Sequence, residues 1–196
     1  MGKVQSTKDL IMLLLYAKGH RGQQAEPVRG RTRLMKMVFL FKMEVRRKFN
    51  MDKAVPQAAL PDFIPYDYGP FSPQVFTDVD FLADLGLVQV KRVGASLQER
   101  AIASQEYEHW RMGEALDESD EVSGEEEFSL SIKGKGFVEE KQAGELSPQQ
   151  WTTLNELKAR CTAAPLKALL RYVYTNYPKY STESEIRNQI LSEGSS

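Results

Sequence analysis

The chain has 196 residues, of which 41% are apolar and 27% are charged, and its formal net charge is −1 at pH 7. This composition excludes a fibrous or largely disordered chain, and the longest apolar run, Leu10 to Ala17, is far shorter than the ~20 residues of a membrane-spanning helix. The single cysteine, Cys161, excludes an intramolecular disulfide and a cysteine-based zinc cluster, so we expect a cytoplasmic protein with no membrane segment.

The first predicted helix runs from Ser6 or Thr7 to about Lys18. A hydroxyl residue in the N-cap position precedes an apolar stripe, and Gly19 follows as a stop signal. Residues 19 to 30 are expected to form a loop.

A second helix is predicted from about Thr32 to Phe49, where apolar residues recur at the i, i+3, i+4 spacing of one buried face. On a helical wheel Arg33, Lys36 and Arg47 fall on the opposite side, with Glu44 among them. These positions predict a short basic stripe.

Residues 50 to 71 contain four prolines, so we expect an extended backbone without a helix there. The next helix is predicted to begin after Ser72 as N-cap, with Pro73 in the first helical position, and to end at Gly86. Its charged residues are all aspartates (Asp78, Asp80 and Asp84). Its predicted buried stripe consists of Val75, Phe76, Val79, Leu82 and Leu85.

Two segments, Leu87 to Val93 and Glu127 to Ile132, alternate in polarity and predict an antiparallel hairpin. Between them, residues 94 to 127 hold two Lys or Arg against eleven Asp or Glu. We expect a helical stretch from Ser96 to Leu116 in this acidic insertion, followed by a mobile polar run. A turn and a short helix follow at 133 to 141.

Three further helices are predicted in the last fifty residues. The first is capped by Ser147 and Pro148 and runs to about Arg160, and the second spans Pro165 to about Tyr177. The third begins at Thr182, with Glu185 three residues later in a capping-box pattern.

This order of helices and strands is that of a winged helix, a helix-turn-helix variant completed by a β-hairpin. The predicted fold is therefore mainly α with a small antiparallel β-hairpin (α+β). We expect a winged-helix-like domain over residues 1–146, with the acidic insertion at 94–127. A C-terminal helical appendage over 147–196 is expected to pack on this core.

The charges are distributed unevenly, because residues 1 to 53 hold thirteen Lys or Arg against four Asp or Glu. Such polarity suggests a basic face that meets something anionic, and a solvated charged surface is the alternative. The candidate nucleic-acid or partner-binding residues are Arg29, Arg31, Arg33, Lys36, Arg46, Arg47, Lys48, Lys91 and Arg92.

The sequence gives no support for a catalytic site, a metal site or a cofactor. Neither His20 nor His109 lies beside a serine nucleophile motif, and Cys161 sits among apolar residues of a predicted helix, which favours a structural thiol. A metal nuclease pattern would need a carboxylate where Gln89 stands, and the glycines near residue 135 lack the spacing of a phosphate-binding loop.

The helix at 73 to 85 occupies the place of a recognition helix, yet it carries three aspartates and no Lys or Arg, so duplex phosphates would repel it. Our leading hypothesis is a non-enzymatic protein that binds another protein through the basic second-helix face or the acidic insertion. The alternative is a DNA-binding regulator that uses the basic stripe and the hairpin cations. Self-association stays open.

Aromatic residues crowd two segments. Phe63, Tyr66, Tyr68 and Phe71 surround the proline-rich turn, and four tyrosines lie between Arg171 and Tyr180. Core packing, contact with a partner and stacking on bases are all compatible with this pattern.

Three stretches of the chain form a familiar combination: Gly30 to Val45, Tyr66 to Val88 and Leu169 to Ile186. Together they resemble the YwgA-like proteins of prokaryotes, and the first two are more distantly similar to the Panacea, or SocA-like, antitoxin domain. Arg31, Thr32, Leu34 and Lys36 match the helix motif of that pattern. Its turn motif, which we take as structural, is matched by Tyr68, Gly69, Pro70, Phe71 and Ser72, with Tyr66 just before it. The third stretch lies in the C-terminal tyrosine segment.

This resemblance implies a winged-helix-like accessory protein associated with toxin neutralisation, mobile elements or defence, which acts by binding rather than by catalysis. The acidic insertion departs from the family pattern.

Overall fold

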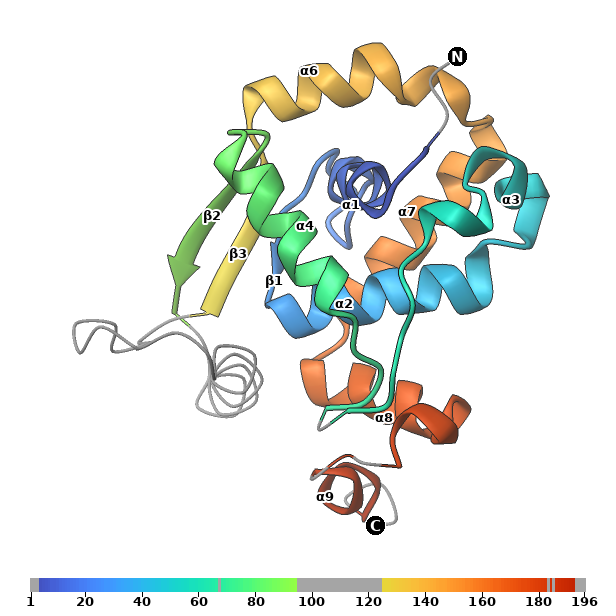
Figure 1. Cartoon of the computed structure of the whole chain (residues 1–196). Coiled ribbons are helices and arrows are strands. Elements are labelled where there is room, and N and C mark those ends of the chain that lie inside the picture. The colour runs from blue at the N-terminus through green and yellow to red at the C-terminus, as the bar shows by residue number, and fades with distance from the viewer. Residues whose placement is uncertain (1–3, 67, 95–124, 183, 185, 193–196) are drawn as a thin grey trace.

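A computed structural model describes residues 4–66, 68–94, 125–182, 184 and 186–192 (Figure 1). The predicted fold class is confirmed, because helices make up most of the described chain and the strands form one small antiparallel sheet. The helix and the polar run predicted within the acidic insertion lie outside the described residues.

Helix α1 is seen end-on at the centre of the view, with α2, α4, α6 and α7 around it, and the sheet lies along one side of the molecule (Figure 1). The helices are α1 (Thr7–Tyr16), α2 (Arg31–Leu40), α3 (Met51–Ala54), α4 (Pro73–Asp84), α6 (Ile132–Lys141), α7 (Pro148–Ala163), α8 (Leu166–Asn176) and α9 (Arg187–Ser192). A π-helical turn (Phe41–Val45) continues α2, and 3-10 turns lie at Lys48–Asn50, Gln57–Ala59, Ala143–Glu145 and Pro178–Tyr180.

The sheet has the strand order β1-β3-β2, and both pairings are antiparallel. Its strands are β1 (Val28–Arg29), β2 (Val88–Val93) and β3 (Glu125–Leu130). Phe128 of β3 is the central residue, since Val28 pairs with it on one side and Val90 on the other. The predicted hairpin is thus present, and β1 adds a strand inside the segment expected to be a loop. The order of these elements is compatible with a winged helix, and that interpretation stays a prediction.

The starts of α1, α4 and α7 follow the predicted capping signals. Ser6 accepts a hydrogen bond from the Asp9 amide, and the Asp9 carboxylate accepts one in return from the Ser6 amide at 3.0 Å. Ser147 and Gln150 make the same reciprocal pair at the start of α7. Pro73 occupies the first turn of α4, where its missing N–H leaves no intrahelical hydrogen bond unmade.

The largest difference from the sequence prediction concerns α2. Every residue from Thr32 to Leu40 is buried, because α4 and β1 pack on parts of its surface and α7 and α8 pack on others. The predicted basic stripe is therefore wrong at Arg33 and Lys36, whose side chains are buried with the apolar ones. A helix enclosed on all sides has no solvent face for a polar stripe to occupy.

Three boundary predictions were also wrong. The proline-rich segment does contain helical turns, α3 and Gln57–Ala59, because its prolines lie outside both. Leu85, predicted to be buried, follows the last residue of α4 and is exposed. The last helix begins at Arg187 rather than at Thr182, and Glu185 of the predicted capping box is outside the described residues.

The three stretches that carry the family resemblance meet in space. Lys36 of α2 donates a hydrogen bond from Nζ to the Pro70 carbonyl at 3.1 Å. Gly69 has a φ of +85°, and a Cβ on it would lie 2.5 Å from the Cε1 atom of Tyr174 in α8. The Tyr174 hydroxyl in turn accepts a hydrogen bond from Ser184 at 3.1 Å. The turn therefore joins α2 to the C-terminal segment.

The aromatic residues around this turn pack mainly on one another and on the core. Tyr66 stacks on Phe71, with ring centroids 4.8 Å apart, and Phe71 meets Phe76 of α4 edge-on. Tyr68 and Ser72 are buried. Phe39 of α2 meets three further rings edge-on at 5.1 to 5.2 Å, those of Phe63, Tyr177 and Tyr180. Core packing accounts for these rings without a bound partner.

Replacing Gly69 by alanine should destabilise the fold strongly, because it adds both a left-handed alanine and a clash with the Tyr174 ring. We expect Gly69→Ala to lower the free energy of unfolding by about 1–3 kcal/mol more than Gly22→Ala. Gly22 is the matched control, since its φ is also positive, +73°, but nothing lies within 4 Å of an added Cβ. Urea unfolding of both variants measures the difference, and equal losses would contradict the proposed ring contact.

Candidate functional site

The aspartates of α4 do not form the acidic surface that the sequence suggested. Asp78 is buried and accepts a hydrogen bond from Lys8 Nζ of α1 at 2.8 Å. Asp80 accepts one from Arg31 Nη2 at 2.6 Å. The outward side of α4 therefore carries one exposed aspartate, Asp84, together with neutral and apolar side chains. The ion pairs of Asp78 and Asp80 reduce the negative potential that the three aspartates of this helix would otherwise produce.

Arg31 is a junction between α2, α4 and the sheet. Its guanidinium donates to both carboxylate oxygens of Glu126 as well as to Asp80. It also lies over the rings of Phe76 and Phe128, with its central carbon 5.4 Å from each centroid. Burial alone would lower the pKa of Arg31, but these acidic partners raise it above its usual value, so the group is permanently charged.

The other candidate cations are distributed over several parts of the molecule. Arg33 donates through Nη1 to the carbonyl oxygens of Cys161 and Ala164, both at 2.6 Å, at the end of α7. Lys36 lies in the core, as described above. The remaining candidates are exposed or half-buried: Arg29, Arg46, Arg47, Lys48, Lys91 and Arg92. Within the described part of the chain these six do not form a continuous face, and their binding of a partner stays a prediction.

The hairpin cations face acidic residues across the sheet. Lys91 of β2 is paired in register with Glu127 of β3, and Arg92 with Glu126. Opposite charges directly across an antiparallel pair attract each other and reduce the net positive potential of the strand. The hairpin is therefore a mixed surface rather than a basic one.

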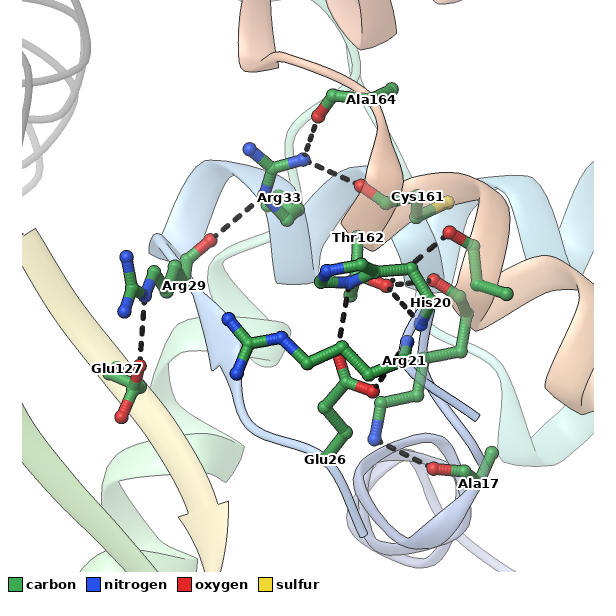
Figure 2. A network of polar contacts seen from close by, with 12 residues as sticks. Ala17, His20, Arg21, Glu26, Arg29, Arg33, Glu127, Cys161, Thr162 and Ala164 are labelled. Atoms are coloured by element: carbon green, nitrogen blue, oxygen red, sulfur yellow. Dashed lines mark hydrogen bonds and ion pairs between the residues drawn. The ribbon is translucent and has the colours of Figure 1, made fainter. Parts of the chain in front are cut away.

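A pocket of about 610 Å³ lies where the loop after α1, the sheet and the end of α7 meet (Figure 2). Its wall combines arginines with carboxylates and small residues. The lining residues are His20, Arg21, Glu26, Pro27, Arg29, Arg33, Gly94, Glu125, Glu127, Thr162, Ala163, Ala164 and Pro165. The structure thus brings two of the predicted candidates, Arg29 and Arg33, to one place, and adds Arg21 and His20, which the sequence analysis did not select as binding residues.

Glu26 organises the loop that borders this pocket. Its buried carboxylate lies 2.8 Å from Nδ1 of His20 and accepts a hydrogen bond from the Arg21 amide at 3.0 Å. Gly19 permits the close approach, because a Cβ there would lie 2.5 Å from Cδ of Glu26. The loop is also fastened to α7, since the His20 amide donates to Oγ1 of Thr162 at 3.2 Å. The loop therefore has a defined shape at the pocket.

Lys158 is a buried cation that the sequence analysis missed. Its Nζ donates to the carbonyl oxygens of Leu15 and Ala17, at 2.7 and 2.9 Å, where α1 ends. Burial lowers the pKa of Lys158 to about 7, and the nearby Glu26 opposes this change. A lysine in register with the apolar positions Leu154, Leu157 and Cys161 was the sequence signal that could have revealed it.

Cys161 is a structural thiol by its environment. It is buried, and that burial raises its pKa to about 12, so the sulfur stays protonated and weakly nucleophilic at neutral pH.

Within the described ranges, no group of three or more His, Cys, Asp or Glu side chains is arranged to hold a metal ion. A search of the same residues finds no helix long and apolar enough to cross a membrane.

A second polar cluster, also missed, surrounds Glu44 on the π-helical turn. Its carboxylate accepts hydrogen bonds from Arg160 of α7 at 2.6 Å, from the Tyr172 hydroxyl at 2.9 Å and from the Tyr177 hydroxyl at 3.1 Å. Burial and the adjacent carboxylate raise the pKa of both tyrosines, so neither is an activated nucleophile. The cluster ties α2 to α7 and α8.

Comparison of the chain with protein-family models, with curated proteins and with solved structures gave no match. The resemblance to the YwgA-like and Panacea proteins therefore stays a prediction, as do the roles that it implies.

Lys158 should make the stability of the protein depend on pH. Its folded-state pKa of about 7 lies below the usual 10.5, so the unfolded chain binds more protons between these values and the free energy of unfolding rises with pH. Between about pH 7 and about pH 8.5 we expect a rise on the order of 1 kcal/mol, measured by urea unfolding.

Two variants separate this effect from other titrations. Lys158→Met, which removes the buried charge, should abolish the rise, whereas Lys141→Met at an exposed lysine should retain it. A wild-type protein with no rise, or an unchanged rise in Lys158→Met, would refute the assignment.

Proposed function

We propose that this chain is a non-enzymatic binding protein whose main partner is another protein, contacted at the junction of α4 and α6. The observation that carries the proposal is a set of exposed apolar side chains. Phe81 is 48% exposed, Leu85 45% and Ile132 92%. We call these three residues the α4–α6 patch. An antitoxin-like or defence-related role, as the family resemblance implies, belongs to the same proposal.

Contacts between the two segments support treating these residues as one surface. Phe81 and Leu85 are four positions apart at the end of α4, so they lie on the same side of the helix. Ser131 donates from Oγ to the Gly86 carbonyl at 2.7 Å, and Lys133 donates from Nζ to the Leu85 carbonyl at 2.9 Å. Ile132 stands between these two residues in the chain, at the start of α6, and the start of α6 lies beside the end of α4 (Figure 1).

The side chains of this surface favour a protein partner over duplex DNA. Contacts with duplex phosphates require cations, whereas the outward side chains of α4 are Gln74, Thr77, Phe81 and Asp84. The cations of α2 that could have compensated, Arg33 and Lys36, are buried and donate to backbone carbonyls. Clustered exposed apolar side chains are instead typical of a surface that another protein covers.

Ile132→Asp should disrupt the partner complex, because it places a charge in the centre of the α4–α6 patch. The full chain, tagged and recovered from its native cell, identifies co-purifying proteins, and Ile132→Asp should reduce recovery of the specific partner by at least about 10-fold. Ile64→Asp is the matched control, since Ile64 is a 51% exposed isoleucine in a different segment and its variant should retain the partner.

Three outcomes would count against this proposal. One is recovery that is equal in both variants, and a second is a partner lost on nuclease treatment. The third is direct, salt-sensitive binding of duplex DNA that Arg47→Ala weakens and Ile132→Asp does not, which would favour the DNA-binding alternative.

A further inference from the structure

We propose that the pocket shown in Figure 2 binds a small molecule through its phosphate or carboxylate group, with Arg21 and Arg29 as the residues that recognise the anion. We call it the arginine pocket. It lies apart from the α4–α6 patch, and the proposal does not depend on the proposed protein partner.

Of the three acidic residues in the wall, Glu125 is buried, and Glu26 and Glu127 are paired within the protein. Glu26 is held by His20 and by the Arg21 amide, and Glu127 accepts a hydrogen bond from Nε of Arg29 at 2.9 Å. A carboxylate that is paired in this way contributes less repulsion to an incoming anion than a solvated one does. The carboxylates therefore shape the pocket more than they oppose an anion.

The arginines retain donors that the protein does not use. A guanidinium has five N–H donors in a planar fork. Among the described residues Arg29 has a partner only at Nε, and the Arg21 guanidinium has none. Figure 2 shows the Arg21 side chain extending from the loop without a contact at its end. These donors are the part of the wall that can bind a ligand.

The positions of these arginines are fixed by the fold. Arg29 lies in β1, and its carbonyl accepts a hydrogen bond from Nε of Arg33 at 3.1 Å. Arg33 is anchored in turn on the end of α7. Arg21 follows His20, whose amide donates to Thr162 of α7 and whose imidazole lies 2.8 Å from Glu26 of the same loop. The backbone at each position is therefore preorganised, which lowers the entropic cost of binding.

The size and chemistry of the pocket define the class of ligand. Its volume of about 610 Å³ is within the range of small-molecule sites, about 300–1,000 Å³. Planar guanidinium groups bind carboxylate and phosphate oxygens in pairs, which gives both groups the same recognition. The paired carboxylates Glu26 and Glu127 can accept hydrogen bonds from hydroxyl or amino groups on the rest of the molecule. A metabolite of nucleotide size or smaller that carries one of these anions fits this description.

Isothermal titration of the full chain with pyrophosphate, and separately with citrate, tests the proposal at low ionic strength near neutral pH. Binding of either compound at one site per chain is expected, and Arg21→Ala should weaken it by at least about 10-fold. Binding of pyrophosphate alone would assign the site to phosphate compounds, and binding of citrate alone to carboxylates. Arg21 is exposed, so its replacement leaves the packed core intact.

Arg47→Ala supplies the control, because Arg47 is an exposed arginine that does not line the pocket. Its variant should bind the anion as the wild type does. Binding of neither compound, or equal weakening by Arg21→Ala and Arg47→Ala, would overturn the proposal. Ile132→Asp should leave anion binding unchanged, so the protein-binding role of the α4–α6 patch and the anion-binding role of the arginine pocket are tested independently.

Discussion

The fold depends on two buried basic side chains that donate hydrogen bonds to carbonyl groups at the ends of buried helices. The last carbonyl groups of a helix have no partner within it, and water cannot reach them when the helix end is enclosed. Here Lys158 supplies donors to the end of α1, and Arg33 supplies them to the end of α7. Arg33, and Lys158 when it is protonated, also lie at the negative end of a helix dipole, which offsets part of the cost of burying the charge.

These contacts explain the uneven charge of the sequence. Several cations of the first fifty residues connect elements of the protein itself: Lys8 to Asp78, Arg31 to Asp80 and Glu126, and Arg29 to Glu127. Their acidic partners come later in the chain. Opposite charges that are far apart in the sequence therefore lie next to each other in the fold. A linear excess of one charge is therefore a poor measure of the surface that a partner meets.

The helix starts and the two longer strands were predicted correctly, because each depends on residues that are neighbours in the chain. Ser6, Ser72 with Pro73, and Ser147 with Pro148 placed three helix starts correctly, because capping depends on residues within one turn. The period-two segments likewise placed β2 and β3. The two residues of β1 are too few to show a period. This strand is defined by its pairing with the edge of β3 that β2 leaves open, where Val28 lies opposite Phe128.

The site could be predicted only in part. A helical wheel assumes one buried face, so it assigned Arg33 and Lys36 to solvent although α2 is enclosed all round. Arg29 and Arg33 were selected for their charge, but the pocket that joins them to His20 and Arg21 requires the loop after α1 to dock on α7, which no local pattern encodes. The α4–α6 patch was not predicted for a similar reason. Leu85 fits the apolar stripe of its own helix, so the helical wheel assigned it to the core.

These two helix-end contacts also join segments of the chain that are synthesised far apart in time. Arg33 is made early but its carbonyl partners on α7 come about 130 residues later, and α1 must wait as long for Lys158. During synthesis the N-terminal helices therefore emerge before the α7 carbonyl groups that complete the contacts of Arg33 and before the lysine that closes the end of α1. The first 146 residues, although they contain the sheet and the centre of the core, cannot complete their interior until the ribosome has released the C-terminal helices.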